Sequence, residues 1–385
     1  MEKIRSVLVI GGGVGGLTLA TALARHGIDV LLIERRPAFD VPGVGLGQPA
    51  NALRVYDALG VLDEVLAKGF IYDSMKVCDF NREIIVDHKF LLGDERIPAV
   101  CALSRTQLHS ILLGAATRAG VKIRLGLTVE RIVDEAGQTE VEFSDGSSGR
   151  FDLVAGFDGI RSTTRQHLVG TTFGPRPSGY GAWRIQVPRV DAVRGMEFLQ
   201  GLGSKTGAMP LSDDVMYLFH IRPEAPDARY EGRGNAELLR QRLAGYGSYV
   251  ADIRETLHEG SDVVYSPIEP MMLPWPWFSG RVVIGGDAAH TFPPHLTQGA
   301  AMAVEDAMIL AREVLATDVA VAERLMRYSQ ARYARCAFVY TFSREWLDAE
   351  QSVRTMEQLN SVRAEMKLNG SNWIAASDRI LNTPI

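Results

Sequence analysis

A glycine-rich turn close to the start of the chain constrains the fold more than any other feature. It follows an apolar strand predicted over Ser6–Ile10 and places Gly11, Gly13 and Gly16 at the spacing of a GxGxxG motif. A helix and a second strand ending at Glu34 are predicted next, which indicates a βαβ unit. In such a unit the glycines permit a tight turn, a close approach of backbone N–H groups to a pyrophosphate and close helix packing, and the carboxylate binds a ribose diol. The pattern predicts a Rossmann-like fold that binds a dinucleotide; the alternative is a glycine-rich turn without a ligand.

A second strand-end carboxylate lies far downstream. The apolar strand Val282–Ile284 leads into Gly286-Asp287, and a helix is predicted to begin near Gln298-Gly299. The carboxylate can accept hydrogen bonds from sugar-alcohol hydroxyls, and the helix N-terminus can stabilise a developing negative charge. A reduced flavin carries such a charge, whereas a nicotinamide would not need this second site. The two sites together predict one long cofactor held from both ends; the alternative for Asp287 is an ordinary helix cap.

A third motif, Asp158-Gly159, follows another predicted strand. Arg161, Ser162 and Arg165 come directly after it. Taken alone, this segment is typical of a turn that leads into a helix cap.

Composition excludes several other classes of protein. The chain has 385 residues and a formal net charge of −5, which argues against a dominant nucleic-acid or anionic-membrane surface. The three cysteines, Cys78, Cys101 and Cys336, have neither disulfide-framework nor zinc-site spacing, so we expect buried thiols and no metal. The apolar run Val7–Ile10 is too short for a signal sequence, and no stretch has the apolar length of a membrane span. We therefore expect a protein of the reducing cytoplasm without stable membrane association.

The pattern of elements changes in the middle of the chain. Between Gly174 and Pro276, prolines, tryptophans and alternating strands indicate a mixed sheet, and the Rossmann-like pattern returns at Arg281. Residues 323–381 are charged and helical. These changes predict one cofactor domain that is interrupted by a sheet domain.

The order and spacing of the three motifs resemble those of the group A flavoprotein monooxygenases, the family of p-hydroxybenzoate, salicylate and 6-hydroxynicotinate hydroxylases. The resemblance extends to about residue 345, and the string QGAAMAVEDA is similar to the salicylate and 6-hydroxynicotinate branch. It implies an α/β fold in which a Rossmann-like FAD-binding domain of the GR2 type is interrupted by a mixed β-sheet substrate domain and followed by C-terminal helices. The corresponding boundaries are 1–75, 100–175 and 278–345 for the FAD-binding domain, 76–99 and 176–277 for the substrate domain, and 346–385 for the C-terminal helical segment.

The resemblance also implies which residues hold the cofactor. Arg105 would contact the flavin nucleotide, Asp158 would serve both FAD and NAD(P)H, and Asp287 would bind the ribityl chain. The predicted cofactor-binding residues are Gly11, Gly13, Gly16, Glu34, Arg35, Gly45, Arg105, Asp158, Gly159, Asp287, Gly299 and Ala300. Two positions depart from many members of the family: Thr297 stands where they have the first glycine of GQG, and Ala301 stands where they have asparagine.

The implied chemistry is an NAD(P)H- and O₂-dependent hydroxylation. NADH or NADPH would reduce FAD, O₂ would add to give a flavin C4a-hydroperoxide, and one oxygen would pass to a small aromatic or N-heteroaromatic, phenolic substrate. Such a reaction is typical of aromatic compound catabolism. The alternatives are a flavin monooxygenase for a larger polyketide or quinone-like substrate, and an FAD dehydrogenase or non-catalytic flavoprotein without oxygen transfer. The oligomeric state stays open, with a homodimer as one candidate.

Four residues are candidates for the catalytic side of the flavin. Tyr217 and His220 lie in one predicted strand but on opposite faces, because side chains alternate, so a regular strand brings at most one of them to the pocket. Deprotonation of a ring hydroxyl would activate the substrate, and His220 could accept such a proton near neutral pH. Pro294 resembles the family proline on the substrate side of the flavin, and His295 directly follows it. For both histidines and Tyr217 the alternative is a packing role.

Overall fold

The GxGxxG segment forms the predicted βαβ unit at the centre of a parallel sheet. The structure, a computed structural model, describes residues 2–39, 44–135, 137–230, 232 and 234–385. Strand β1 (Ser6–Ile10) pairs in parallel with β2 (Asp29–Glu34), and helix α1 (Val14–Ala24) connects them. The six-stranded sheet has the order β19-β20-β12-β1-β2-β8 and includes β8 (Lys122–Leu125), β12 (Leu153–Gly156), β19 (Phe278–Ser279) and β20 (Val282–Ile284).

The three motifs lie at one edge of this sheet because each follows the carboxyl end of a parallel strand. The glycine turn follows β1, the Asp158 segment follows β12 and the Asp287 segment follows β20, and these strands run in the same direction. Ligands of open α/β sheets bind at this edge. The topology therefore gathers residues that are more than a hundred positions apart in sequence.

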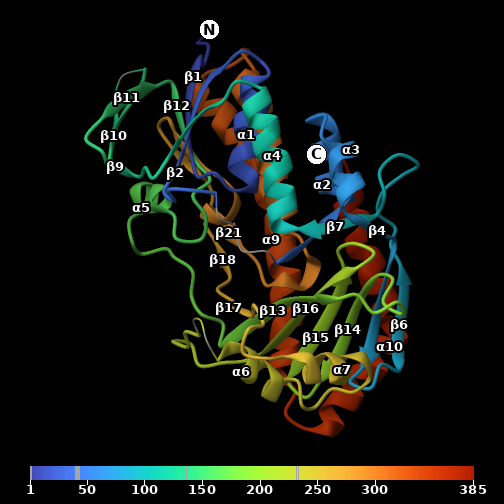
Figure 1. The fold of residues 1–385 in the computed structure, drawn as a ribbon. Helices are drawn as coiled ribbons and strands as arrows, with labels where there is room; N and C mark the ends of the chain where they lie inside the picture. The colour runs from blue at the N-terminus through green and yellow to red at the C-terminus, as the bar shows by residue number, and fades with distance from the viewer. Residues whose placement is uncertain (1, 40–43, 136, 231, 233) are drawn as a thin grey trace.

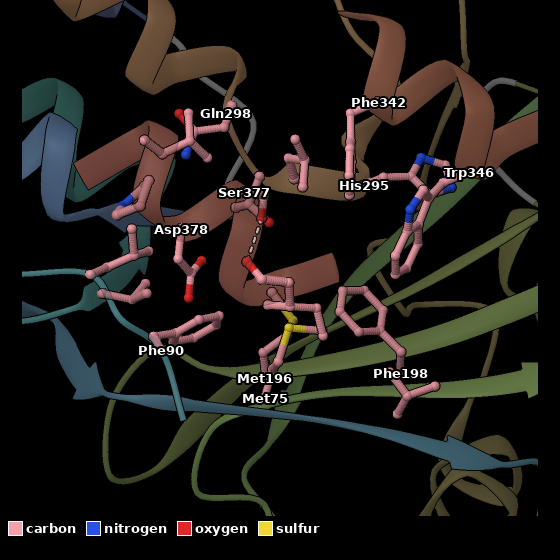
Figure 2. Close-up of a pocket in the computed structure, with 18 of the residues that line it drawn as sticks. Met75, Phe90, Met196, Phe198, His295, Gln298, Phe342, Trp346, Ser377 and Asp378 are labelled. Carbon is pink, nitrogen blue, oxygen red and sulfur yellow. Dashed lines mark hydrogen bonds between the residues drawn. The ribbon is translucent and has the colours of Figure 1, made fainter. Parts of the chain in front are cut away.

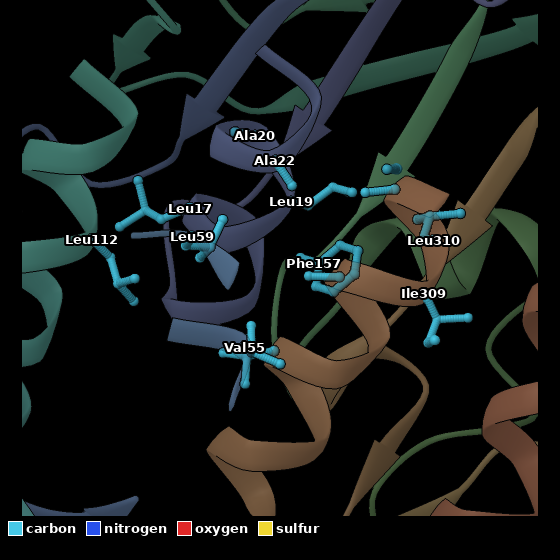
Figure 3. Close-up of a cluster of buried hydrophobic side chains, with 14 of the residues drawn as sticks. Leu17, Leu19, Ala20, Ala22, Val55, Leu59, Leu112, Phe157, Ile309 and Leu310 are labelled. Atoms are coloured by element: carbon cyan, nitrogen blue, oxygen red, sulfur yellow. The ribbon is translucent and has the colours of Figure 1, made fainter. Parts of the chain in front are cut away.

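Helices cover one face of the six-stranded sheet and bury most of the core. Helix α1 packs against α4 (Arg105–Arg118) and α8 (Gly299–Leu315), and α2 (Ala50–Ala58) packs against α8. Figure 3 shows part of this core, to which Leu17, Phe157 and Leu310 belong, with Phe157 between the other two in this view. The opposite face is covered by a small antiparallel sheet of β9 (Val129–Asp134), β10 (Thr139–Phe143) and β11 (Ser148–Phe151). A second small sheet joins β3 (Gly45–Pro49), β4 (Phe70–Tyr72) and β7 (Val100–Ser104), next to α3 (Leu62–Lys68).

A seven-stranded mixed sheet forms the lower body in Figure 1. Its order is β17-β13-β16-β15-β14-β5-β6, and only β14 and β5 pair in parallel among its described strands. The strands are β5 (Ser74–Asp79), β6 (Ile84–Lys89), β13 (Tyr180–Pro188), β14 (Met196–Gly201), β15 (Ser204–Pro210), β16 (Val215–Pro223) and β17 (Val264–Pro267). The sheet thus unites the two segments predicted to form the substrate domain, although β5 begins two residues before the predicted boundary at residue 76.

Helices flank this sheet on both sides. One face packs against α6 (Asn235–Arg242) and α7 (Ser248–Thr256), which are separated by a segment that contains Gly245 and Gly247. Helix α9 (Val321–Ser352) runs without a break across residue 346, the predicted start of the C-terminal helical segment. Helix α10 (Met356–Asn382) follows and packs against β6, and in Figure 1 these red helices connect the two bodies.

The remaining short elements carry the sequence motifs. They are α5 (Thr163–Val169), β18 (Met271–Met272), η1 (Gly286–Ala288), β21 (His290–Thr291) and η2 (Pro294–Leu296). Every helix within the described part of the chain is too short or too polar to cross a lipid bilayer. The predicted fold class, an α/β body interrupted by a mixed sheet and followed by helices, is confirmed.

Candidate active site

The glycine turn has one position that is open to a ligand and two that the fold requires. Gly11 has a φ of +107°, and a Cβ on Gly16 would lie 2.0 Å from the carbonyl oxygen of Gly11. A Cβ on Gly13, in contrast, would meet no protein atom within 4 Å. Gly11 and Gly16 therefore allow the turn and the close helix packing, while Gly13 leaves space above the N-terminus of α1, where a phosphate would bind.

A cleft at this turn gathers most of the predicted nucleotide-binding residues. It is lined by Gly11, Gly13, Glu34, Arg35, Arg105, Asp158 and Gly159. The Glu34 carboxylate accepts hydrogen bonds from Gly12 N (2.9 Å) and Arg36 N (3.0 Å), which fixes it at the end of β2. The buried His109 also lines the cleft, and its Nε2 lies 2.8 Å from Gly12 O. His109 was not predicted, because a histidine inside a predicted helix has no distinguishing spacing.

Asp158 caps a helix and also keeps one carboxylate oxygen without a partner. Its Oδ2 accepts from the backbone N–H groups of Thr163 (2.9 Å) and Thr164 (3.0 Å) at the start of α5. Its Oδ1 is buried and has no hydrogen-bond partner in the described part of the structure. A Cβ on the adjacent Gly159 would meet nothing within 4 Å. The segment thus has the predicted cap and, in addition, a free acceptor beside an open backbone.

Asp287 and Arg105, two of the predicted cofactor-binding residues, influence each other's ionisation. The Asp287 side chain is exposed to solvent. The surrounding protein nevertheless removes part of its hydration and raises the pKa of its carboxyl group, whereas the charges of His290 and Arg105 lower this pKa. The pKa of the Arg105 guanidinium is lowered by burial, while the charge of Asp287 acts in the opposite direction. The residue predicted on α4 and the one predicted after β20 are therefore close enough to interact electrostatically.

A buried cluster of charges holds the Asp287 turn in place. The Asp306 carboxylate accepts from Gly286 N (2.8 Å) and lies 2.6 Å from His290 Nε2. Arg332 Nε donates to the other oxygen of Asp306 (2.7 Å), and its Nη1 lies 2.6 Å from Glu305. We call Asp306, Glu305, His290 and Arg332 the Asp306 cluster. Burial alone would lower the pKa of His290, but Cys336 and Asp306 raise it to about 10, which gives this histidine a structural role.

The start of α8 borders both the cofactor end and a second cavity. Thr297 has a φ of +55°, a left-handed conformation that glycine adopts readily, so the glycine expected from the family resemblance would fit the same backbone. Gln298 is buried and accepts from Asn51 Nδ2 (3.0 Å). A Cβ on Gly299 would meet nothing within 4 Å, and Ala300 follows at the helix start. The predicted flavin-contacting residues Gly299 and Ala300 therefore lie at an open helix N-terminus.

The second cavity lies between the seven-stranded sheet, the η2–α8 segment and the two C-terminal helices. Figure 2 shows His295, Gln298, Trp346 and Asp378 around it, with Met196 and Phe198 on the sheet. Most of its lining is apolar and includes Tyr72, Met75, Val77, Phe90, Leu92, Val100, Met196, Phe198, Phe342, Trp346, Met366, Ile374 and Leu381. Such a lining suits a substrate with a large apolar surface.

Three ionisable residues meet at one side of this cavity. Lys205 Nζ donates to Glu350 Oε1 (2.8 Å), and His295 Nε2 lies 3.1 Å from Glu350 Oε2. Burial opposes the charge on Glu350, but Lys205 and His295 lower its pKa to about 2. The pKa of His295 is lowered by burial and by Lys205, so at neutral pH its neutral ring donates Nε2–H to Glu350. We call these residues the Lys205 cluster; neither Lys205 nor Glu350 was predicted from the sequence.

The four predicted catalytic residues occupy different places. His295 lines the cavity, whereas Pro294 is exposed at the start of η2. Tyr217 is buried against strand β3. A Cβ added to Gly45 would lie 2.7 Å from the Cβ of Tyr217. His220 lies on the opposite sheet face, its Nδ1 2.9 Å from Thr206 Oγ1, and burial lowers its pKa to about 3. Strand alternation therefore turns the ring of His220 away from this cavity.

Comparisons with known proteins agree with this arrangement. A family model described as "FAD binding domain" matches residues 5–343. The 2-heptyl-3-hydroxy-4(1H)-quinolone synthase of Pseudomonas aeruginosa is 32% identical over 338 residues, which cover 87% of this chain and 86% of that protein. The 6-hydroxynicotinate 3-monooxygenase of Bordetella bronchiseptica is 28% identical over 381 residues, or 91% of this chain and 94% of that protein. The crystal structure of Klebsiella pneumoniae HpxO with FAD and uric acid has a TM-score of 0.85 at 25% identity and covers 98% of this chain and 96% of that chain.

Proposed function

The chain belongs to the FAD binding domain family of flavoprotein monooxygenases, and on that premise we propose that it hydroxylates an aromatic or N-heteroaromatic substrate with NAD(P)H and O₂. Its relatives are named as FAD-dependent monooxygenases and hydroxylases of aromatic compounds. When bound, FAD supplies the oxygen-activating chemistry, and NADH or NADPH supplies the electrons.

The observation that carries the proposal is the adjacency of the cofactor end and the apolar cavity. Leu296, Thr297 and Gln298 line the cavity, and the open helix N-terminus at Gly299 comes next in the chain. A ring held against these residues would therefore lie beside a flavin bound at the start of α8. This juxtaposition favours a reaction on a bound aromatic compound over a flavoprotein that transfers electrons only at its surface.

The described residues fit FAD at both of its ends. The glycine turn, Glu34 and Arg105 would hold the nucleotide, and Asp287 would bind the ribityl hydroxyls. The open backbone at Gly13, Gly159 and Gly299 leaves room for the cofactor, since a Cβ at each would meet no protein atom. The electrostatic interaction between Arg105 and Asp287 supports the proposal that both belong to one continuous site.

The cavity residues would exclude water and handle one proton. Apolar side chains from α9 and α10 cover the cavity, which limits the access of water to the reacting centre. His295 is the candidate proton acceptor: with Nε2–H donated to Glu350, its buried Nδ1 has no partner among the described residues. Glu350 would then stabilise the protonated ring, as the carboxylate partner of a general-base histidine does. Tyr217 stays a catalytic candidate, because it lies in the same cluster of the sheet face as the cavity residues Met196 and Phe198.

Oxygen incorporation is the direct test of the proposal. The purified protein should show flavin absorbance or bind added FAD, and a matching aromatic substrate should stimulate the oxidation of NADH or NADPH. Product formed under ¹⁸O₂ should carry one ¹⁸O atom. Reduced pyridine nucleotide consumed with a matching product that lacks ¹⁸O would instead identify a dehydrogenase, and failure to bind FAD would overturn the whole assignment.

A further inference from the structure

The apolar cavity carries no unpaired positive charge. Among the described residues that line it, the acidic and basic side chains are those of Lys205, His295, Glu350 and Asp378. Lys205 is 5% exposed and is paired with Glu350, and the neutral His295 donates to the same carboxylate. Asp378 accepts from Leu91 N (2.9 Å) and lies 3.2 Å from His88. The cavity is therefore neutral or slightly negative.

This charge balance disfavours a substrate that carries a free carboxylate. A buried anion needs an opposite charge or several donors that are not already committed, because its desolvation costs several kcal/mol. Lys205 is the cation at the cavity wall, and Glu350 already neutralises it at 2.8 Å. An uncharged ring with hydrogen-bonding groups, in contrast, can share the remaining donors and acceptors of the Lys205 cluster without a new buried charge.

The other side of the cavity offers a flexible apolar surface. Met75 and Met196 come from the sheet, and Met366 and Ile374 come from α10. Figure 2 shows Met75 and Met196 at the bottom of the cavity, with Phe90 nearby and the polar His295 on the opposite side. Methionine side chains adapt their shape to the ligand, so a chain of methylene groups can pack among them.

We propose that the substrate is an uncharged aromatic or N-heteroaromatic ring with an apolar side chain. The ring is hydrogen-bonded by the Lys205 cluster, and the chain packs against Met75, Met196 and α10. This inference rests on the proposed monooxygenase function and names its substrate class. It also gives the C-terminal helices a function, because α9 supplies Glu350 and α10 supplies one wall of the site.

Matched ligands separate the charge of the substrate from the shape of its ring. The FAD-loaded protein is titrated with 4-quinolones that carry methyl, butyl or heptyl at position 2, and with 4-quinolone-2-carboxylate. Trp346 lines the cavity, so its fluorescence, together with that of the flavin, reports binding. Affinity should rise roughly two- to fourfold for each added methylene group, and the carboxylate should bind more weakly than the methyl compound.

Two pairs of variants test the two sides of the cavity. Glu350→Gln leaves Lys205 without its counterion and should tighten binding of the carboxylate by roughly tenfold or more, whereas Glu345→Gln, exposed on the same helix, should not. Met366→Glu should abolish the dependence on chain length, whereas Leu368→Glu should retain it because Leu368 is 78% exposed. If Glu350→Gln does not fold, the charge-free double variant Lys205→Met/Glu350→Leu should keep the dependence on chain length.

Some outcomes overturn this inference and leave the monooxygenase intact. A carboxylate that binds as tightly as the heptyl compound, an affinity independent of chain length, or no binding of the alkyl series contradicts the proposed substrate class. Incorporation of ¹⁸O into an aromatic acid would then show that the monooxygenase function holds while the inferred class is wrong. Absence of FAD binding would instead contradict the proposed function itself.

Discussion

Replacement of Asp306 by asparagine should destabilise the α/β body although the variant side chain has nearly the same shape. Asp306 is fully buried and joins Gly286 N, His290 and Arg332 at 2.8, 2.6 and 2.7 Å. Asparagine keeps one carbonyl oxygen but loses the negative charge that both cationic partners contact. The turn that carries Asp287 would then lose its anchor, so FAD binding should weaken together with stability.

The expected loss of stability follows from the partners that remain. Removal of one partner from a buried ion pair typically costs about 3–5 kcal/mol. Arg332 keeps its contact with Glu305 at 2.6 Å, so its charge is not left alone. His290 can become neutral in response. Both compensations favour the lower end of the range, so we expect the free energy of unfolding to fall by about 3 kcal/mol.

The loss should depend on pH in a defined direction. The folded-state pKa of His290 is raised from 6.5 to about 10, so its stabilising contribution is complete below pH 6.5 and is lost as the pH rises toward 10. The folded-state pKa of Asp306 is lowered to about 2, so its contribution is present above pH 3.8 and is lost as the pH falls toward 2. The difference between the wild type and Asp306→Asn should therefore be largest between these limits and shrink in alkaline solution.

Urea unfolding followed by tryptophan fluorescence measures this difference. Trp277 is suited as the probe because its ring centre lies 5.3 Å from that of His290. Asp348→Asn is the matched control: Asp348 pairs with Arg344 on an exposed turn of α9, so its loss should cost no more than about 0.5 kcal/mol. A change below about 1 kcal/mol for Asp306→Asn, or a difference that is constant from pH 6 to pH 9.5, would refute the assigned role of the cluster.

Three further predictions concern the cofactor site and the sheet. Gly16→Ala should destabilise the apoprotein by about 1–3 kcal/mol, because the added Cβ would lie 2.0 Å from Gly11 O. Gly13→Ala should leave the stability of the apoprotein unchanged but weaken FAD binding, because its Cβ would enter the open space at the turn. Urea unfolding and FAD titration distinguish the two variants. Asp287→Ala should weaken FAD binding by roughly tenfold or more, and an affinity equal to that of the wild type would contradict the ribityl assignment. His220→Gln should change kcat of the folded enzyme by less than about twofold, since its ring contacts Tyr246 between α6 and α7 and does not line the cavity. A large loss of kcat would support a catalytic role for His220.

The sequence was most informative where function depends on the backbone. The turns at Gly11, Asp158 and Asp287 each follow a strand that could be recognised from its apolar run, and their spacing alone indicated the family and the cofactor. Glycines that must allow a tight turn leave a local signature, because few other residues can replace them there. Strand alternation likewise predicted that Tyr217 and His220 lie on opposite faces, although it could not decide which face meets the cavity.

Only the tertiary structure decided which side chains form the apolar cavity proposed to bind the substrate. Lys205, His295 and Glu350 come from a sheet strand, a short turn and the end of a long helix, and no spacing in the sequence connects them. The effect of a buried charge on ligand binding depends on its partner, because Lys205 would attract a carboxylate if Glu350 did not neutralise it. The sequence therefore determined the cofactor, through local backbone constraints, whereas the charge and shape of the substrate site depend on long-range packing that brings distant side chains together.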